Sequence, residues 1–312
     1  MYRIIEARPV GFNIKQFVIE APRIAHKQRP GQFVILRLHG RGERIPLTIK
    51  AADPAAGTVT VVVQGVGKTT SLLNCLETGD YVLDMVGPLG RPSEIEHYGT
   101  VLILAGSVGT AMALPTAKAL KQAGNHVIFV EGARCREMVV FEEELREASA
   151  EAFFMTDDGS YGEKGLVTAK LNQLLAAGRK IDFVLAVGPV PMMRAVAEIT
   201  CPLGIRTVVS LNTIMVDGTG MCGGCRVLVG QKSMFACVDG PEFDASQINF
   251  EVLMQRNAMY REQECESLKQ FEEHKQEDLA ELRKELASRE AELEHLRAEI
   301  ADLGAAAEAR HA

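Results

Sequence analysis

Short segments in which apolar and polar side chains alternate fill the first hundred residues, and this period of two is typical of strands with one buried face. Two Pro- and Gly-containing triplets, at 9–11 and 29–31, are predicted to be turns between strands. The predicted strands are 2–8, 12–20, 32–38, 45–51, 58–64 and 80–86. Six short strands at regular spacing predict a small, closed, antiparallel β-barrel over residues 1–98.

From Thr100 onward, continuous apolar runs alternate with segments of helical period. A fully apolar strand such as TVLILAG at 100–106 is expected where helices cover both faces of a sheet. The predicted strands are 100–106, 126–131, 152–156, 182–187 and 205–210, with helices at 111–124, 140–149, 165–177 and 191–199. Residues 99–213 should therefore form a doubly wound α/β domain, which binds its ligand at the carboxyl ends of the strands.

After residue 250 the chain becomes rich in Glu, Lys, Arg, Ala and Leu, which predicts one long helix over 251–312. An apolar seam with 3-4 heptad spacing, interrupted only by Arg289, consists of Leu279, Leu282, Leu286, Leu293, Leu296, Ile300 and Leu303. We expect the last three to four turns of this seam to pair with a partner helix in a short coiled coil. The alternative is a solvated helix packed on its own body. Residues 304–312 are Ala-rich and should fray.

The composition limits the class of protein. A chain of 312 residues with 47% apolar residues can build about two domain cores. Its net charge of −7 argues against a nucleic-acid surface. No apolar run approaches the ~18 residues of a membrane span, and the first residues carry charges where a signal peptide is apolar, so we expect a cytoplasmic protein. Of its seven cysteines three are clustered, which favours metal ligation over disulfides.

The stretch 216–238 is dense in metal-type ligands within a Gly-rich turn, and we assign residues 214–250 to a small [2Fe–2S] module. Its pattern is Asp217-x4-Cys222-x2-Cys225-x11-Cys237. The plant-type [2Fe–2S] spacing is Cys-x4-Cys-x2-Cys followed by a distant Cys. A carboxylate in the first place is anionic like a thiolate, although it is a harder donor.

Two other interpretations of these cysteines are a tetrahedral zinc site and a Cys-x-x-Cys redox pair. Zinc would usually bring a second close pair or a histidine, and the stretch contains no His. The spacing therefore favours an iron–sulfur cluster.

Two short stretches of the predicted barrel carry anion-binding chemistry. In the stretch 44–48, an arginine and a hydroxyl stand at opposite ends, and Pro46 marks an edge position free of ladder bonding. In the stretch 65–70, glycines precede a helix predicted over 70–77 and present free backbone N–H groups and hydroxyls to an anion. Its Gly-Lys-Thr order resembles a Walker loop but lacks the glycine that must stand five residues before Gly67, so ATP or GTP hydrolysis is not favoured.

The carboxyl ends of the α/β strands carry the residues of a candidate dinucleotide site. Gly106 and Gly109 form a turn that would let a phosphate approach, although such a pair also occurs in any tight strand-to-helix corner. Asp157 and Asp158 end the third strand, where a carboxylate binds ribose hydroxyls and repels a 2′-phosphate, which favours NAD(H) over NADP(H). The alternative is a solvated turn. Gly188 ends the fourth strand and would let a nicotinamide approach closely.

Several separate segments together resemble the ferredoxin–NADP reductase superfamily. Within it the likeness is to electron-transfer subunits of dihydroorotate dehydrogenase and sulfide dehydrogenase, and above all to the small subunits of NADH-dependent reduced ferredoxin:NADP oxidoreductase, a flavin-based electron-bifurcating enzyme. The segments are ERIPLTI (43–49), LAGSVGTAMALP (104–115), EGARCREMVVFEEEL (131–145), TDDGSYGEKGLVT (156–168), VGPVPMM (187–193) and LNTIMVDGTGMCGGCRV (211–227). The likeness covers roughly residues 1–260, and the last segment is the most specific.

This resemblance implies three cofactors and their binding residues. FAD would have its pyrophosphate on Arg44 and its isoalloxazine near Thr48, within a motif and phosphate cradle made of Arg44, Pro46, Leu47, Thr48, Gly65, Gly67 and Thr69. NAD(H) would be held by Gly106, Gly109, Asp158 and Gly188. The [2Fe–2S] ligands would be Asp217, Cys222, Cys225 and Cys237.

The chain departs from the family pattern at two positions. Many members have Cys-Gly-Pro where this chain has Val187-Gly188-Pro189, so a thiol beside the nicotinamide is not expected. Dihydroorotate-type subunits normally have Cys in the place of Asp217, which moves the likeness toward the bifurcating small subunits.

The resemblance implies a relay of single electrons between a partner and the cluster, and of a hydride between FAD and NAD(H). The sequence shows no nucleophile–base pair, so a larger catalytic subunit, similar to a glutamate synthase small subunit, is expected to hold the other substrate. An alternative is the electron-transfer subunit of a dihydroorotate dehydrogenase, or of a sulfide dehydrogenase or hydrogenase complex. An alternative of another class is a non-catalytic flavoprotein module that its coiled coil recruits to an assembly.

Overall fold

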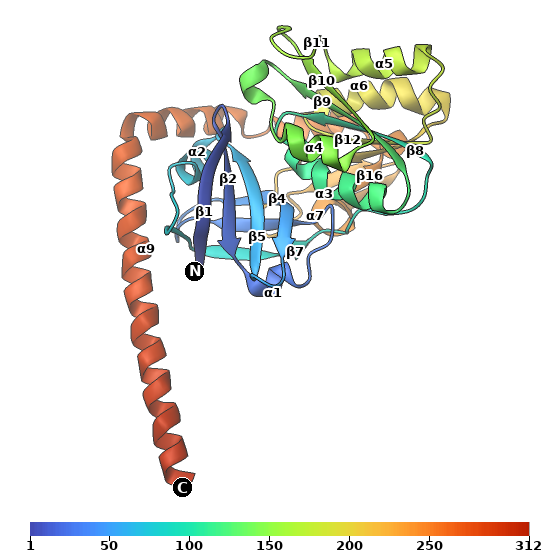
Figure 1. Cartoon of the computed structure of the whole chain (residues 1–312). Coiled ribbons are helices and arrows are strands. Elements are labelled where there is room, and N and C mark those ends of the chain that lie inside the picture. Colours follow the sequence, from blue (N-terminus) through green and yellow to red (C-terminus); the bar gives the residue numbers. More distant parts are fainter. Residues whose placement is uncertain (312) are drawn as a thin grey trace.

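The computed structural model describes the backbone of residues 1–311 and the side chains of residues 1–301. Figure 1 shows an antiparallel barrel, an α/β domain beside it, and a helix that crosses over the barrel and then runs down its outer side. The predicted fraying of 304–312 and the seam position Leu303 lie outside the residues whose side chains are described. Within residues 1–311, none of the helices has the length and apolar character that a bilayer-spanning helix needs.

The first domain is an antiparallel sheet of seven strands in the order β6-β1-β2-β5-β4-β3-β7. Its strands are β1 (Tyr2–Gly11), β2 (Ile14–Glu20), β3 (Phe33–Arg37), β4 (Arg44–Asp53), β5 (Thr58–Gln64), β6 (Tyr81–Val82) and β7 (Asp84–Leu89). The strand predicted over 80–86 is divided at Leu83, and its two parts pair with opposite ends of the sheet. The sheet is therefore curled, with its two end strands separated in the chain by Leu83 alone, which agrees with the predicted antiparallel barrel.

Local details of the barrel differ from the sequence prediction. The triplet 9–11 lies inside β1, and the hairpin turn is made by Phe12 and Asn13, with Asn13 in a left-handed conformation at φ 54. Asparagine tolerates this conformation better than most residues, which explains a turn without glycine at this position. A short helix, α1 (Pro22–Ala25), follows β2, and α2 (Lys68–Leu73) begins two residues before its predicted start.

The second domain has a mostly parallel sheet in the order β11-β10-β9-β8-β12-β13-β16. Its strands are β8 (Thr100–Gly106), β9 (His126–Ala133), β10 (Glu151–Thr156), β11 (Glu163–Lys164), β12 (Phe183–Val187), β13 (Arg206–Ser210) and β16 (Glu242–Asp244). Its helices are α3 (Gly109–Gln122), α4 (Glu142–Ala148), α5 (Val167–Ala176) and α6 (Val190–Thr200). Helices α3 and α4 share a core with one face of the sheet, and α5 and α6 share a core with the other. The predicted doubly wound domain is confirmed.

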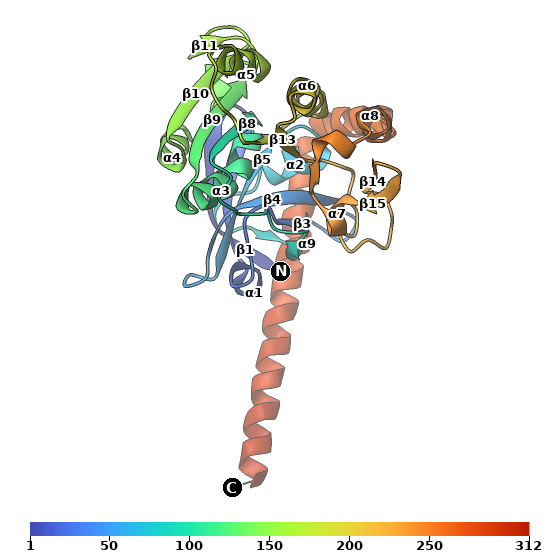
Figure 2. The same cartoon turned by 90° about the vertical axis from the view of Figure 1, so that its right-hand side faces the viewer.

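The ligand-rich stretch forms a small module at the edge of this sheet. A hairpin of β14 (Arg226–Val229) and β15 (Lys232–Phe235) leads into α7 (Ala236–Asp239) and then into β16, which pairs antiparallel with β13. In Figure 2 the hairpin and α7 stand to one side of the molecule, below α8 (Phe250–Asn257). The module is thus fastened to the α/β domain through its last strand.

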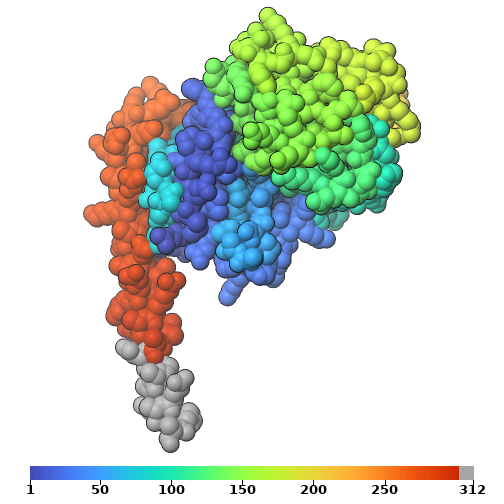
Figure 3. All heavy atoms as spheres, in the orientation of Figure 1, coloured from blue at the N-terminus to red at the C-terminus, as the bar shows by residue number. Residues whose placement is uncertain are grey.

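The C-terminal segment is two helices and not the single one predicted. Helix α8 ends before residues 258–260, and α9 (Arg261–His311) bends at His274, where φ is −116. The first half of the seam packs on the chain's own body, as in the alternative interpretation, because Leu282 and Leu286 are 2% and 5% exposed within the barrel core. Pairing of the last turns of the seam with a partner helix stays a prediction. Further along α9, Leu296 and Ile300 are 46% and 69% exposed, and Figure 3 shows the helix leaving the body of the protein there.

Candidate electron-transfer site

The four predicted cluster ligands lie in two pairs. Asp217 Oδ1 is 3.4 Å from Cys222 Sγ, and Cys225 Sγ is 3.2 Å from Cys237 Sγ. Within the described residues, no three acidic, His or Cys side chains gather at one point. A [2Fe–2S] cluster takes two protein ligands on each iron, whereas a structural zinc ion needs four around a single centre. The donor set therefore fits a two-iron cluster better than zinc.

The charges of these ligands fit a bound cation. Asp217 accepts hydrogen bonds from the N–H groups of Thr219 at 3.0 Å and Cys222 at 2.9 Å, which lower the pKa of its carboxyl to about 2 and keep it anionic. Burial, followed by contact with Cys225, raises the pKa of the Cys237 thiol to about 12. A metal ion deprotonates a coordinating thiol outright. Iron bound here would therefore stabilise the two thiolates, whose charged form burial disfavours.

Glycines let the ligand loop lie close to the barrel. Gly218 and Gly220 have φ of 75 and 84, and a Cβ at Gly218 would lie 2.6 Å from Leu89 of β7 and 2.7 Å from Ile35 of β3. The guanidinium of Arg256 in α8 donates to the carbonyl of Gly224 at 3.2 Å. The loop is thus held between the barrel and α8.

A cavity of about 280 Å³ lies between the barrel and the α/β domain. Pro46 and Thr48 of β4 line it from the barrel, Met112 lines it from α3, and the segment 210–215 forms a further wall. The pairing of β4 with β5 begins only at Ile49, so one edge of the residues before it is free, as predicted for Pro46. The wall 210–215 runs directly into the cluster loop, so the candidate flavin cavity and the cluster loop share one piece of backbone.

The residues predicted to bind the FAD pyrophosphate come from β4, from the loop before α2 and from α2 itself, and only part of the predicted arrangement is present. Thr69 is buried in α2, and its hydroxyl donates to the carboxylate of Glu43, the neighbour of the exposed Arg44, so the two predicted stretches do meet. The prediction that the loop amides are free is wrong for Val66 and Gly67, because both donate to Thr70 Oγ1 at 3.0 Å. An anion would therefore find fewer free amides here than the glycines indicate.

The other two predicted barrel residues differ in their surroundings. Leu47 points into the barrel core at 8% exposure, so only its backbone could face a flavin. Gly65 lies against Asn13, where a Cβ would be 2.7 Å from the side-chain oxygen. Gly65 is therefore needed for packing, whatever its role toward a ligand.

Three of the predicted dinucleotide residues converge at the carboxyl ends of β8 and β12. A Cβ on Gly109 would lie 2.4 Å from the carbonyl oxygen of Val187, and one on Gly188 would lie 3.1 Å from the amide nitrogen of Gly106. Asp158 lies two strands away, after β10. Its carboxylate accepts hydrogen bonds from the Ser160 hydroxyl at 2.6 Å and from the Ser160 N–H at 2.9 Å, and these lower the pKa of Asp158. Backbone can thus approach a ligand at the glycines, and an anionic carboxylate stands further along the same edge.

Unpartnered polar atoms mark the same turn. Three buried side-chain oxygens at the start of α3 and in the adjoining strand have no hydrogen-bond partner in the described part of the chain: Ser107 Oγ, Thr110 Oγ1 and Glu131 Oε2. Burial raises the pKa of Glu131 to about 8, although its other oxygen accepts from the Val140 N–H at 2.9 Å. Orphaned donors and acceptors beside a helix N-terminus fit a polar ligand such as a dinucleotide.

Sequence reasoning missed several residues of this region. Met112, Asn212, Thr213 and Asn257 line the cavity, and Asn257 donates to the carbonyl of Asn212 at 2.9 Å. The position of Asn212 and Thr213 just after the fifth predicted strand was a usable signal, because ligands bind at strand ends. Nothing in the sequence pattern indicated Asn257, which comes from a different helix.

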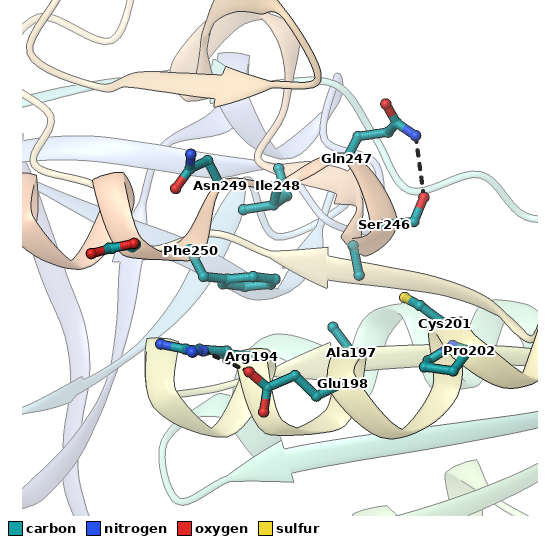
Figure 4. Close-up of a pocket in the computed structure, with 12 residues that line it drawn as sticks. Arg194, Ala197, Glu198, Cys201, Pro202, Ser246, Gln247, Ile248, Asn249 and Phe250 are labelled. Carbon is teal, nitrogen blue, oxygen red and sulfur yellow. Dashed lines mark hydrogen bonds and ion pairs between the residues drawn. The ribbon is translucent and has the colours of Figure 1, made fainter.

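Another hollow, of about 500 Å³, lies elsewhere, between α6 and the segment before α8. Figure 4 shows Ala197 and Cys201 facing Ile248 and Phe250 across it, while Arg194 pairs with Glu198 on its own helix. None of the predicted cofactor residues lines this hollow, so it is not part of the candidate site.

Comparison with known proteins defines the class first. Residues 212–249 match the iron-sulfur cluster binding domain of dihydroorotate dehydrogenase B. A solved structure of an NADH-dependent reduced ferredoxin–NADP oxidoreductase, described for its flavin-based electron bifurcation, is 45% identical, with a TM-score of 0.82 over 87% of this chain and 98% of that one. The chain therefore has the FAD- and NAD-binding fold of ferredoxin reductases and carries an iron–sulfur domain, as its sequence predicts.

Two relatives show the family to which this chain belongs. The dihydroorotate dehydrogenase B (NAD(+)) electron transfer subunit homolog of Thermotoga maritima is 47% identical over 86% of this chain and 94% of its own length. The electron transfer subunit of Geobacillus thermodenitrificans is 30% identical over 78% of this chain and 96% of its own length. The protein belongs to the family of dihydroorotate dehydrogenase B electron transfer subunits and their homologues.

Proposed function

We propose that this chain links NAD(H) to a larger catalytic subunit, with FAD in the cavity between its two large domains and a [2Fe–2S] cluster on Asp217, Cys222, Cys225 and Cys237. The observation that carries this proposal is the shared backbone: segment 210–215 lines the cavity and leads straight into the two ligand pairs. When bound, FAD exchanges electrons singly or in pairs and the cluster exchanges them one at a time.

The residues of the chain bind and orient these groups and need not act as acids or bases. Pro46 and Thr48 would receive the flavin on the barrel side of the cavity, where Met112 closes the side toward α3. Gly106 and Gly188 would admit the nicotinamide nucleotide, because neither has a side chain to block the strand ends. Asp158, kept anionic, would favour NAD(H) over NADP(H), since it would repel a 2′-phosphate.

The finer proposal is that the complex bifurcates electrons and that ferredoxin and NADP(H) chemistry takes place on the partner. Its support is the 45% identity with the oxidoreductase structure described for bifurcation, together with Asp217 at a position where dihydroorotate-type subunits normally have Cys. A second candidate is the electron-transfer subunit of a dihydroorotate dehydrogenase, which the names of the curated relatives favour.

The partner would dock where the cluster loop reaches the surface. Val216, Met221 and Val238 are 48%, 90% and 44% exposed and flank the ligands in sequence. Exposed apolar side chains grouped around a redox centre fit an interface that shortens the distance to a second centre and excludes water.

A separate contact is proposed for the outer half of α9, whose exposed seam consists of Leu293, Leu296 and Ile300. A second copy of this chain cannot pair with the seam in a parallel orientation. Residues 279–286 of that copy would overlap with the barrel, which already covers the same residues of this chain. An antiparallel copy would set the acidic row Glu292 and Glu299 against itself. We therefore assign this seam to a helix of the partner subunit whose apolar stripe is flanked by basic side chains.

Anaerobic purification of the native complex tests the function. We expect flavin and [2Fe–2S] absorption, about two irons per chain, and bleaching of both by NADH. Cofactors inert to NADH would instead favour a non-catalytic assembly module, and a protein free of iron would remove the proposal. The co-purifying subunit separates the two candidates: reduction of NADP⁺ with ferredoxin supports bifurcation, and oxidation of dihydroorotate supports the second.

A further inference from the structure

Thr213 is a buried threonine with an unpaired hydroxyl. Its side chain is 7% exposed, and Oγ1 is buried without a hydrogen-bond partner among the residues whose side chains the structure describes. A buried hydroxyl is normally paired, so an orphan of this kind indicates an occupant that completes it.

The position of Thr213 indicates the occupant. The residue lines the 280 Å³ cavity together with Pro46 and Thr48, and it stands four residues before Asp217. It also borders a smaller cavity of about 110 Å³ next to Gly224 of the cluster loop. Thr213 thus lies on the wall between the candidate flavin site and the ligand loop.

The backbone around Thr213 is fixed before any ligand arrives. The carbonyl of the preceding Asn212 accepts from Asn257 of α8, and Leu211 donates its N–H to the carbonyl of Pro241 at 2.9 Å. A hydroxyl on a fixed segment can orient a planar ring with little further ordering, whereas a hydroxyl on a loose loop cannot.

We propose that the hydroxyl of Thr213 forms a hydrogen bond with the polar edge of the flavin ring and acts as a positioning residue that sets the flavin's reduction potential. The inference rests on the proposed function, because it requires FAD in this cavity. A hydroxyl can donate as well as accept, and hydrogen bonds to the ring are one of the means by which a protein tunes a flavin. Reduction adds negative charge to the ring, so a donated hydrogen bond stabilises the reduced form more than the oxidised form.

The test compares Thr213→Val, which keeps the shape and removes the hydroxyl, with Thr213→Ser, which keeps the hydroxyl. Both variants are prepared as full-length holoprotein, and the measurements are FAD content, the visible flavin spectrum and an anaerobic potential titration. We expect Thr213→Val to shift the oxidised-to-reduced equilibrium about tenfold toward the oxidised form, about 30 mV for a two-electron couple. Thr213→Ser should restore the wild-type potential, and the spectrum of the cluster should stay unchanged in both.

The outcomes distinguish the inference from the function on which it rests. If Thr213→Val binds FAD with the wild-type spectrum and potential, the inference is overturned and the proposed function stands. Equal shifts in Thr213→Val and Thr213→Ser would also overturn it, because the hydroxyl would then not be the cause. Wild-type protein that purifies without FAD and binds none would remove both.

Discussion

The carboxylate of Asp217 has two candidate roles, one in the structure of its loop and one as an iron ligand. It closes the turn of its own loop by accepting from Thr219 and Cys222, and it lies beside the Cys222 thiol in the geometry of a ligand pair. A carboxylate that only closed the turn would be dispensable for iron binding, provided the loop kept its shape. The two uses therefore predict different behaviour when the carboxylate and the turn are changed separately.

Replacing Asp217 with Ala should cause loss of the cluster, because one iron would keep a single protein ligand. FAD should stay bound, because it would occupy a separate cavity. Iron content, visible absorption and FAD content per chain measure this. The matched control is Thr219→Ala, which removes a side-chain contact to Asp217 but leaves the carboxylate and the backbone hydrogen bonds. Full iron content and an unchanged cluster spectrum in Asp217→Ala would exclude Asp217 as a ligand.

The buried carboxyl of Glu131 should make the stability of the fold depend on pH. Burial is the main cause that raises the pKa of its carboxyl to about 8, and the hydrogen bond from the Val140 N–H opposes the shift. A raised pKa means that the folded state prefers the protonated form, so this stability is complete below the unfolded pKa of about 4.3 and is lost as pH rises toward 8.

The substitution Glu131→Gln keeps the shape without the charge. We expect it to raise the melting temperature at pH 8 relative to the wild type and to have little effect near pH 4. Melting curves of the two proteins across this range measure the difference. A difference that does not grow with pH would show that Glu131 is not protonated in the folded protein.

The candidate residues proposed from sequence alone are those that stand in short, regular patterns. The proposed cluster ligands and the glycines at 106 and 109 belong to such patterns, so chain order was enough to propose them. Thr213 could not be identified, because its isolation depends on the absence of partners from several elements. The bond between Thr69 and Glu43 joins residues 26 apart, and no periodicity predicts it.

At the scale of elements, α9 shows what a hydrophobic pattern predicts and what it does not. The heptad spacing correctly placed a helix with one apolar stripe, but such spacing does not tell which surface covers the stripe. Phe271, Leu282 and Leu286 complete the barrel core, while the following turns of the same stripe extend past it. The strand predicted over 80–86 has the same limit: its pattern is right, but its division between two sheet edges follows from closure of the barrel.

The two halves of α9 should respond differently to the same substitution. Leu286→Ala removes a buried side chain and should destabilise the isolated subunit by about 2–5 kcal/mol. Leu296→Ala, at a partly exposed position, should change the stability of the isolated subunit by about 0.5 kcal/mol or less. Chemical denaturation of both variants measures the contrast, and equal effects would contradict the division of the seam. Leu296→Asp should weaken binding of the partner subunit without unfolding the chain.

At the scale of the whole molecule, the candidate sites follow one line through the fold. The candidate nucleotide turn, at Gly106 and Gly109, lies at the carboxyl edge of the α/β sheet, and the candidate flavin cavity lies between this domain and the barrel. Segment 210–215 leads from the cavity to the proposed ligand loop. The line ends at a surface where Val216, Met221 and Val238 are exposed. Each domain thus supplies one wall or one ligand set, and neither large domain alone contains the complete cavity.

This arrangement predicts that a surface substitution can weaken electron transfer to the partner subunit without changing the reduction of the flavin and the cluster by NADH. Met221→Asp places a charge on the most exposed apolar side chain of the cluster loop, so binding of the larger subunit should weaken tenfold or more, about 1.4 kcal/mol. NADH should still bleach the flavin and the cluster of the isolated subunit at the wild-type rate, because the nucleotide turn is untouched.

The control for this change is Leu203→Asp, which puts the same charge on a 60% exposed leucine of the α/β domain, outside the cluster module. Affinity is measured by titrating the larger subunit with each variant, and reduction by stopped-flow absorption. If the partner surface is the cluster loop, Met221→Asp weakens binding and Leu203→Asp leaves it intact. Equal binding by both variants, with normal transfer, would place the interface elsewhere, and the outer half of α9 would then be the next surface to test.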